Sequence, residues 1–202
     1  MLLMKKIVFV LLLIGIGANA QSRRVKDVQD FQKKLNSEFK DEKESPLTEE
    51  DRETFSALDF FPIDTSFIVV AKFELVKDPV SFKMKTTTDR LPVYRTYAKA
   101  SFELKGKQYV LNLYQNENLM ASGDMEDYLF LPFTDKSNGS STYGGGRFID
   151  LSIPKKNEII IDFNKAYNPY CAYNHKYSCP IPPKENHLDL LVEAGVKNYN
   201  KK

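Results

Sequence analysis

The chain of 202 residues contains no tryptophan, only two cysteines and two histidines, and almost no excess of charge. Its 29 lysines and arginines face 27 acidic residues. Two of the basic residues, Lys5 and Lys6, lie in a first stretch of 20 residues that has no acidic side chain, so the rest of the chain is balanced. A balanced surface gives no electrostatic reason to expect nucleic acid or an anionic membrane as a partner.

Several motifs of known chemistry are also missing. The chain has no Gly-x-Ser-x-Gly motif of serine hydrolases and no Gly-Lys-Ser or Gly-Lys-Thr sequence of phosphate-binding loops. It shows no self-similarity with a period of about 20 to 50 residues, which excludes solenoids and propellers. These absences remove the common routes to an assigned reaction, and whether the protein is an enzyme stays open.

The main hydrophobic run is too short to cross a bilayer. Residues 7–16 are apolar, follow Lys5 and Lys6, and precede the small residues Ala18 and Ala20, which together form the three regions of a secretory signal peptide. A membrane-spanning helix needs about 20 apolar residues. We therefore expect a signal peptide over residues 1–20, cleavage near Ala20, and an exported chain in the periplasm or outside the cell. No stable membrane span is expected after cleavage.

Two helices are expected before the first strand. Within residues 21–44, apolar residues recur at every third or fourth position and charged residues fill the other face, which predicts an amphipathic helix or arm. Pro46 interrupts this pattern. A second helix is expected to begin at Thr48 and to end near Leu58, because Thr48 followed by Asp51 is close to a capping box.

From Phe67 onward the hydrophobic period becomes two residues, which is typical of strands. About eight strands are expected, over residues 67–75, 80–86, 97–104, 109–114, 128–133, 147–151, 158–163 and 188–192. Gly106 predicts a hairpin between the third and fourth of them. No helical pattern separates the strands, so we predict a mainly β (α+β) fold, a mostly antiparallel sandwich or partly closed barrel. Residues 45–202 are expected to form this single β-rich domain.

The loop that precedes Arg147 carries four of the nine glycines. A glycine triplet permits positive φ angles and close approach of the backbone to another group. Together with Arg147, its N–H groups could hold an anion or another ligand. Alternatively, the loop is only a turn between strands in which Arg147 pairs with Asp150 or Asp162. A metal site made by Asp135 and Asn138 is a further alternative.

Residues 162–187 hold both cysteines, both histidines and four of the ten prolines. An exported chain meets an oxidising compartment, so a disulfide between Cys171 and Cys179 is expected, which would make the segment a rigid clasp. Four tyrosines of this segment are expected to pack it onto the sheet or to line a pocket: Tyr167, Tyr170, Tyr173 and Tyr177.

The same cysteines allow two alternatives. Cys171, His175, Cys179 and His187 have the ligand types of a tetrahedral zinc site, although the spacing is not that of a common zinc finger. A cysteine nucleophile with one histidine as its base is the other alternative. Apart from this zinc alternative, no cofactor is predicted.

Several motifs of the chain resemble a bacterial family catalogued as domain of unknown function 1684. The resemblance rests on residues 45–47, 131–135, 142–150, 162–164, 166–169, 171–173, 179–183 and Asn186. It covers most of residues 45–197. The family has no assigned activity, so the resemblance implies no catalytic residues. It does place the glycine loop and both cysteines in one pattern, which does not include His175 or His187.

We expect an exported binding or interaction module for a small polar ligand or an envelope protein. The candidate ligand-binding residues are Thr142, Tyr143, Gly144, Arg147, Asp150, Asp162, Asn164, Tyr167 and Asn168. The alternative is a hydrolase-like enzyme that uses Asp150, Asp162, Arg147 or a cysteine, with carboxylates as acid and base. In a third interpretation both motifs only stabilise the sheet, since Asp and Asn at strand ends commonly start turns.

Overall fold

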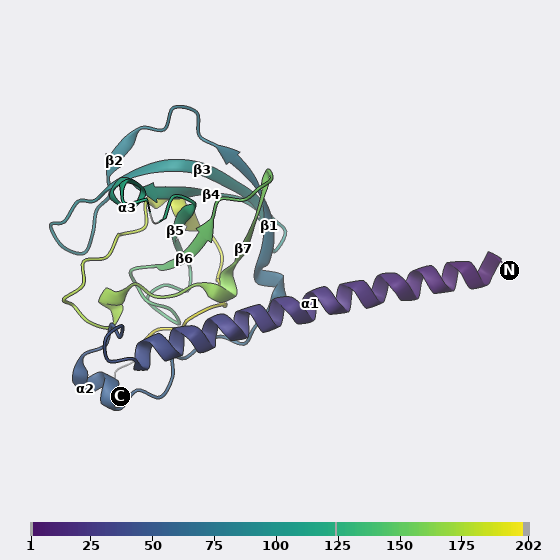
Figure 1. The fold of residues 1–202 in the computed structure, drawn as a ribbon, viewed down its shortest axis with the longest axis horizontal. Helices are drawn as coiled ribbons and strands as arrows, with labels where there is room; N and C mark the ends of the chain where they lie inside the picture. Colours follow the sequence, from purple (N-terminus) through teal and green to yellow (C-terminus); the bar gives the residue numbers. More distant parts are fainter. Residues whose placement is uncertain (1, 124, 200–202) are drawn as a thin grey trace.

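The computed structural model describes residues 2–123 and 125–199, with side chains from residue 21 onward. In this part of the chain eight strands form one curled half-barrel sheet in the order β6-β5-β4-β3-β1-β7, while β2 pairs with β3 and β8 with β5 (Figure 1). All pairings are antiparallel except that of β5 with β8. The predicted mainly β, mostly antiparallel fold is therefore confirmed, and of the two architectures left open, sandwich and partly closed barrel, the structure has the partly closed barrel.

The elements follow the predicted order. The strands are β1 Ile68–Leu75, β2 Ser81–Lys83, β3 Val93–Leu104, β4 Lys107–Asn116, β5 Tyr128–Asp135, β6 Arg147–Ser152, β7 Glu158–Asp162 and β8 His187–Leu188. The helices are α1 Leu2–Lys40, α2 Glu49–Glu53 and α3 Glu117–Ala121, and the short 3-10 turns are η1 Thr65–Phe67, η2 Phe163–Lys165, η3 Tyr170–Ala172 and η4 Lys184–Asn186. Helix α3 was not predicted from the sequence, and β8 is shorter than expected.

The β3–β4 hairpin turns where the sequence predicted. Lys105 and Gly106 have φ angles of 49° and 78°. Two consecutive positive φ angles are those of a type I′ turn, whose twist matches that of the flanking strands. The glycine therefore fixes the register of the longest strand pair of the sheet.

The main core fills the inner face of the curled sheet. On β1, Val69 and Ala71 are buried whereas Val70 between them is 52% exposed, as expected for a strand with one face in the core. The open side of the half-barrel is filled by Phe163 of η2 and by Val192 of the C-terminal segment. This C-terminal segment is thus part of the core.

Asn186 bridges two strands that have little ladder pairing of their own. β4 and β5 share the single register pair Tyr114 with Phe130. The Asn186 amide accepts from Asn112 N at 2.8 Å and donates to Asn112 O at 2.9 Å and to Pro132 O at 2.7 Å. A fully buried side chain therefore supplies the hydrogen bonds that the backbone ladder lacks at this seam.

Helix α1 continues through both segments that the sequence analysis treated separately, and its first half extends away from the sheet (Figure 1). Its second half packs on the domain, where Leu35 and Phe39 are buried in a cluster with Tyr173. The predicted signal peptide falls on residues 1–20, whose side chains lie outside the described part. No helix in the described part of the chain has the length and hydropathy that a membrane-spanning segment needs.

Helix α2 begins as predicted and ends early. The Thr48 hydroxyl accepts a hydrogen bond from Asp51 N at 3.2 Å, so Thr48 is the N-cap. The helix ends at Glu53 instead of near Leu58, because the Leu58 N–H is bonded to the Asn36 side chain of α1 at 2.8 Å. A tertiary contact therefore replaces the last helical turn.

Candidate functional site

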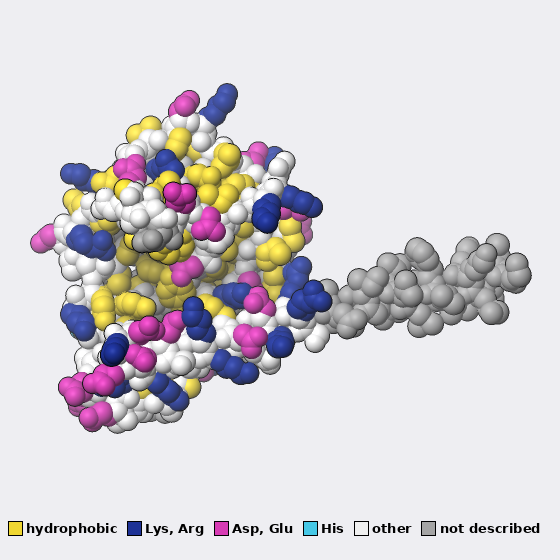
Figure 2. Space-filling view, in the orientation of Figure 1, with side chains coloured by type: hydrophobic (Ala, Val, Ile, Leu, Met, Phe, Trp, Pro, Cys, Tyr) yellow, Lys and Arg dark blue, Asp and Glu magenta, His cyan; other side chains and the backbone are white. Residues whose placement is uncertain are grey.

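A pocket of about 450 Å³ lies between α1, the outer face of β5 and β6, and the segment that contains both cysteines. Figure 2 shows a hollow between α1 and the strands, with hydrophobic side chains gathered on its walls. Eight of the 17 residues that line the pocket are aromatic, far more than the 12% of the whole chain. This pocket is the candidate functional site.

The sheet wall follows from the two-residue period of β5 and β6. Side chains alternate between the faces of a strand, so Leu129 and Ile149 enter the core while Phe130 and Asp150 face the pocket. Phe130 and Asp150 are direct partners in the β5–β6 register. Further aromatic rings extend this wall: Tyr94, Tyr128 and Phe148.

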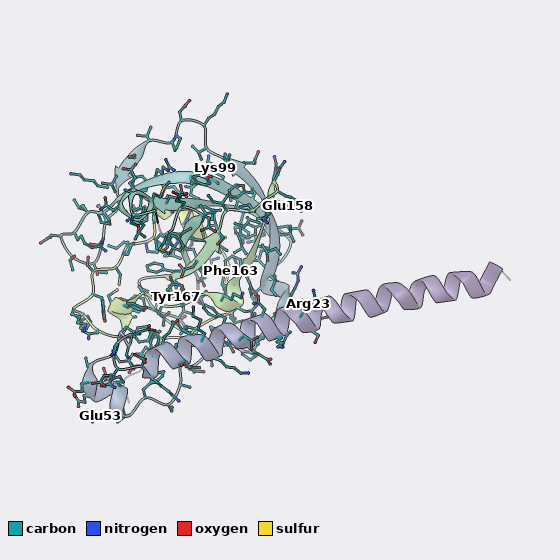
Figure 3. All side chains as sticks on the ribbon, viewed as in Figure 1. Arg23, Glu53, Lys99, Glu158, Phe163 and Tyr167 are labelled. Carbon is teal, nitrogen blue, oxygen red and sulfur yellow. The ribbon has the colours of Figure 1, made fainter. Side chains whose placement is uncertain are left out.

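The other two walls come from distant parts of the chain. Phe31, Lys34, Leu35 and Glu38 form one face of α1, at the spacing of neighbouring helical turns. The third wall is the loop segment with Tyr167, Pro169, Tyr170 and residues 177–180. Tyr167 lies between α1 and the sheet (Figure 3). Three of the four tyrosines of the cysteine segment thus line a pocket, while Tyr173 packs against Phe39 of α1.

The Asp150 carboxylate is held by two phenols. Tyr128 Oη and Tyr167 Oη both donate to Asp150 Oδ1, each at 2.7 Å. Burial, followed by the charge of Asp150, raises the pKa of both tyrosines well above the ordinary value. Two phenols that stay protonated remain hydrogen-bond donors, so they fix the orientation of the Asp150 side chain through Oδ1.

The charges around the pocket leave one negative group without a counter-ion. Lys34 and Glu38 form an ion pair at 3.5 Å on α1, with side chains 78% and 31% exposed. None of the ion pairs formed by the described residues includes Asp150. The charged lining residues are Lys34, Glu38 and Asp150 alone, so the net charge of the described lining is negative.

Arg147 does not face the pocket. Its guanidinium is completely buried, binds Asp135 Oδ2 at 2.9 Å, and donates to the carbonyls of Val192 and Ala194. Burial lowers the pKa of Arg147, and the Asp135 carboxylate opposes that shift. The predicted pairing of Arg147 with Asp150 or Asp162 is wrong, because its partner is Asp135.

The rest of the glycine loop is closed on itself. The buried Thr142 hydroxyl contacts Ser137 Oγ at 2.7 Å and accepts from Asn138 Nδ2 at 2.9 Å. Gly146 has a φ of +87°, and a Cβ there would lie 2.6 Å from Phe133 O, so this position requires glycine. Gly144 is exposed and does not line the pocket. The loop therefore stabilises the start of β6, and its residues do not line the pocket.

Asp162, Asn164 and Asn168 also lie away from the pocket. Asp162 Oδ1 accepts from Asn164 N at 3.0 Å and caps η2, and burial raises the pKa of Asp162. Asn164 exchanges hydrogen bonds with the backbone of Asp64 at 2.9 and 3.0 Å. Asn168 donates to Lys197 O at 2.9 Å. These contacts fit the turn-forming role that the sequence offered as the ordinary explanation.

Cys171 and Cys179 are buried free thiols that contact each other. Cys171 N lies 3.2 Å from Cys179 Sγ, and Tyr143 Oη lies 3.8 Å from Cys171 Sγ. Hydrogen bonding, first with Cys179 and then with Tyr143, lowers the pKa of Cys171. The two cysteines thus lie next to each other, and the disulfide between them stays a prediction. Only Cys179 lines the pocket.

The zinc alternative finds no ligand set in the described part of the chain. No group of three or more His, Cys, Asp or Glu side chains converges there. His175 is exposed, and His187 Nδ1 lies 3.0 Å from Thr134 Oγ1. The histidines therefore do not join the cysteines, and the same geometry leaves the cysteine nucleophile without its expected base.

Among the predicted ligand-binding residues, the structure brings only Asp150 and Tyr167 together in the pocket. The aromatic wall of β5 and β6 was not predicted from the sequence. A signal for it exists, since residues 128–133 are apolar on both faces, and a strand with two apolar faces is covered on both sides. The element that covers the second face is α1, which lies about 100 residues earlier in the chain.

Comparisons with known proteins agree with this description. A family model described as "Protein of unknown function (DUF1684)" matches residues 53–197, which include the sheet and loop walls of the pocket but not α1. An uncharacterized protein of Haloarcula marismortui, solved in solution by NMR, is similar with a TM-score of 0.70 and 32% identity. The alignment covers 89% of this chain and 96% of that one. A search of curated proteins found no match.

Proposed function

The chain belongs to the DUF1684 family of proteins of unknown function, and from this premise we propose that it is a binding module that holds a small ligand in the pocket between α1 and the outer face of β5 and β6. The observation that carries the proposal is the Asp150 carboxylate, fixed by Tyr128 and Tyr167 in a pocket walled by aromatic rings. Aromatic walls with a few fixed polar groups are typical of small-molecule sites.

The hydrolase alternative has less support. It needs Asp150 together with Asp162, Arg147 or a cysteine, but Arg147 is buried against Asp135 and Asp162 caps η2. Only Asp150 and Cys179 remain at the pocket. The other charged lining residues, Lys34 and Glu38, pair with each other, which favours binding over acid–base chemistry at Asp150.

We propose also that residues 1–20 direct export, so that the ligand or an envelope partner is met outside the cytoplasm. Support comes from the basic, apolar and small-residue regions of that segment. Cell fractionation checks this: a processed chain beginning near Gln21 outside the cytoplasm is expected, and a full-length cytoplasmic chain would contradict it.

A fragment screen tests the binding proposal. Neutral, cationic and anionic small molecules are added to residues 21–202, and binding is followed by thermal shift and by NMR of the pocket residues. We expect hits that Leu119→Trp abolishes, because Leu119 lines the pocket and a larger side chain would fill it. Leu191→Trp is the control, since Leu191 is exposed outside the pocket. Hits that are insensitive to Leu119→Trp, or no hits of any charge, would contradict the proposal.

A further inference from the structure

Resting on this proposed function, we propose that the pocket binds a small organic cation, a quaternary ammonium or protonated amine group, between its aromatic rings and the Asp150 carboxylate. The aromatic rings and the Asp150 carboxylate each favour a positively charged ligand, and each does so through its own contacts.

The first part is the unpaired carboxylate. Lys34 and Glu38 neutralise each other at the mouth of the pocket, which leaves Asp150 as the one uncompensated charge of its described lining. Tyr128 and Tyr167 occupy Oδ1 only, and no described group donates to Oδ2. The phenols therefore fix the orientation of the carboxylate and leave one oxygen for a ligand. Asp150 is exposed, so a cation can reach this oxygen from solvent, whereas an anion would be repelled.

The second part is the arrangement of the rings. Phe148 stands nearly perpendicular to two neighbours, at 73° to Phe130 and 90° to Tyr167, with centroids 4.8 and 6.0 Å apart. Tyr170 and Tyr177 are likewise tilted by 62°. In each pair the edge of one ring packs against the face of another, and all of these rings line the pocket. Ring faces carry the negative end of the aromatic quadrupole, so the faces that are open to the pocket attract methylated and protonated amines.

Anion binding has no comparable support. The guanidinium of Arg147 is turned into the protein toward Asp135 and the C-terminal segment. Lys34 is 78% exposed and already paired with Glu38. No other basic side chain is part of the described lining. Arg90 donates to Ser178 of the lining at 3.1 and 2.7 Å but does not itself line the pocket.

The test compares choline with 3,3-dimethyl-1-butanol, its uncharged isostere, on the chain of residues 21–202. We expect choline to bind at least about tenfold more tightly, because only the cation gains from the ring faces and from Asp150. Affinity is measured by calorimetry, and NMR shifts of Tyr128, Phe148 and Tyr167 locate the site.

Asp150→Asn removes the negative charge of this side chain while keeping its size and shape. The amide oxygen can still accept from Tyr128 and Tyr167, so the pocket is kept while its charge is removed. The preference for choline should fall by about tenfold, with the isostere unaffected. Asp189→Asn is the matched control: it makes the same change in net charge at an exposed residue outside the pocket, where Asp189 pairs with Lys136. It should leave both affinities unchanged.

The outcomes separate the two proposals. If choline and its isostere bind equally, or if anionic or neutral fragments bind the pocket better, the cation inference is overturned and the binding module remains. If Asp150→Asn leaves the preference intact, the inference is also overturned. If no fragment of any charge binds the pocket, the proposed function itself fails.

Discussion

At the scale of single residues, Arg147 and Asp135 form the one ion pair among the described residues whose two side chains are both fully buried. Both side chains are 0% exposed. Asp135 Oδ1 further accepts from Ser137 N at 2.8 Å and Val192 N at 3.1 Å, while Arg147 donates to carbonyls of the C-terminal segment. Each charge thus has its counter-ion and further hydrogen bonds in the interior, although Arg147 Nε has no hydrogen-bond partner among the described residues, and each charge depends on the other remaining in place.

Arg147→Met should lower the free energy of unfolding by about 3–5 kcal/mol, because it leaves the Asp135 carboxylate buried without its counter-ion. Urea denaturation followed by circular dichroism measures this. Lys34→Met, which breaks the exposed pair with Glu38, is the control and should change stability by less than about 1 kcal/mol. If the two variants lowered the free energy of unfolding equally, burial of the Arg147–Asp135 pair would not contribute to stability.

The cysteine pair predicts a pH dependence in the reduced protein. Because the hydrogen bond with Cys179 lowers the pKa of Cys171, the Cys171 thiolate should form below the ordinary pH of a thiol. Its contribution to stability is present above the ordinary pKa and is lost as the pH falls through the lowered pKa. Ultraviolet absorbance of the thiolate measures the titration.

Two variants test the origin of this shift. Cys171→Ser should remove the early step of the titration. Tyr143→Phe should move it to higher pH, because the Tyr143 hydroxyl is the next contributor that lowers the pKa of Cys171. A titration that is identical in all three proteins would mean that no thiolate forms at Cys171.

At the scale of elements, the seam between β4 and β5 depends on Asn186. Its amide makes three hydrogen bonds to the backbones of Asn112 and Pro132. Asn186→Ala leaves these backbone groups buried without partners, and each such group costs about 1–3 kcal/mol. We expect a loss of several kcal/mol in stability and faster hydrogen exchange of the Asn112 amide. Asn118→Ala on the exposed part of α3 is the control and should change neither.

The strands were predictable because alternation of side chains is a local property of the chain. Gly106 marked the β3–β4 turn, and Thr48 marked the start of α2, since turn and cap chemistry depend on neighbours in sequence. The partner of Arg147 was not predictable. The β5–β6 register places Phe133 opposite Arg147, which makes Asp135 the diagonal neighbour of Arg147. The hydrophobic periodicity of two strands does not by itself determine their register.

The candidate site was predictable only in part. Asp150 and Tyr167 were named because they belong to distinctive motifs, and their meeting depends on the bridge between Phe148 and Tyr167, which joins β6 to the cysteine segment. The wall on α1 could not be predicted from its own sequence, because an amphipathic helix does not reveal which surface it covers. Leu35 serves both the buried cluster and the pocket.

At the scale of the whole molecule, α1 is both a structural cover and a wall of the pocket. Removing residues 21–40 should expose Tyr173 and open the pocket, since Leu35 and Phe39 pack there. The chain 41–202 is therefore expected to unfold at a lower temperature than 21–202 and to lose fragment binding. Comparison of the two chains by calorimetry tests the expected division into an arm of residues 21–44 and a domain of residues 45–202. Equal stability and binding would show that the arm is dispensable.

The redox state of Cys171 and Cys179 depends on the compartment in which the protein resides. If the chain is exported as proposed, Cys171 and Cys179 should be joined there, because Cys179 Sγ already lies 3.2 Å from Cys171 N. The intact mass after alkylation without reductant should then be about two mass units below that of the reduced chain, with no alkyl group added. Two added alkyl groups would show free thiols.

The burial of Arg147 under the C-terminal segment has a consequence for the timing of folding. The carbonyls that receive its guanidinium belong to Val192 and Ala194, 45 and 47 residues later in the chain. While synthesis proceeds from the N-terminus, β5 and β6 leave the ribosome before these acceptors exist. A nascent chain that stops short of Val192 lacks these acceptors for Arg147 and the Val192 N–H that donates to Asp135, so we expect the half-barrel to close only after this segment has been made.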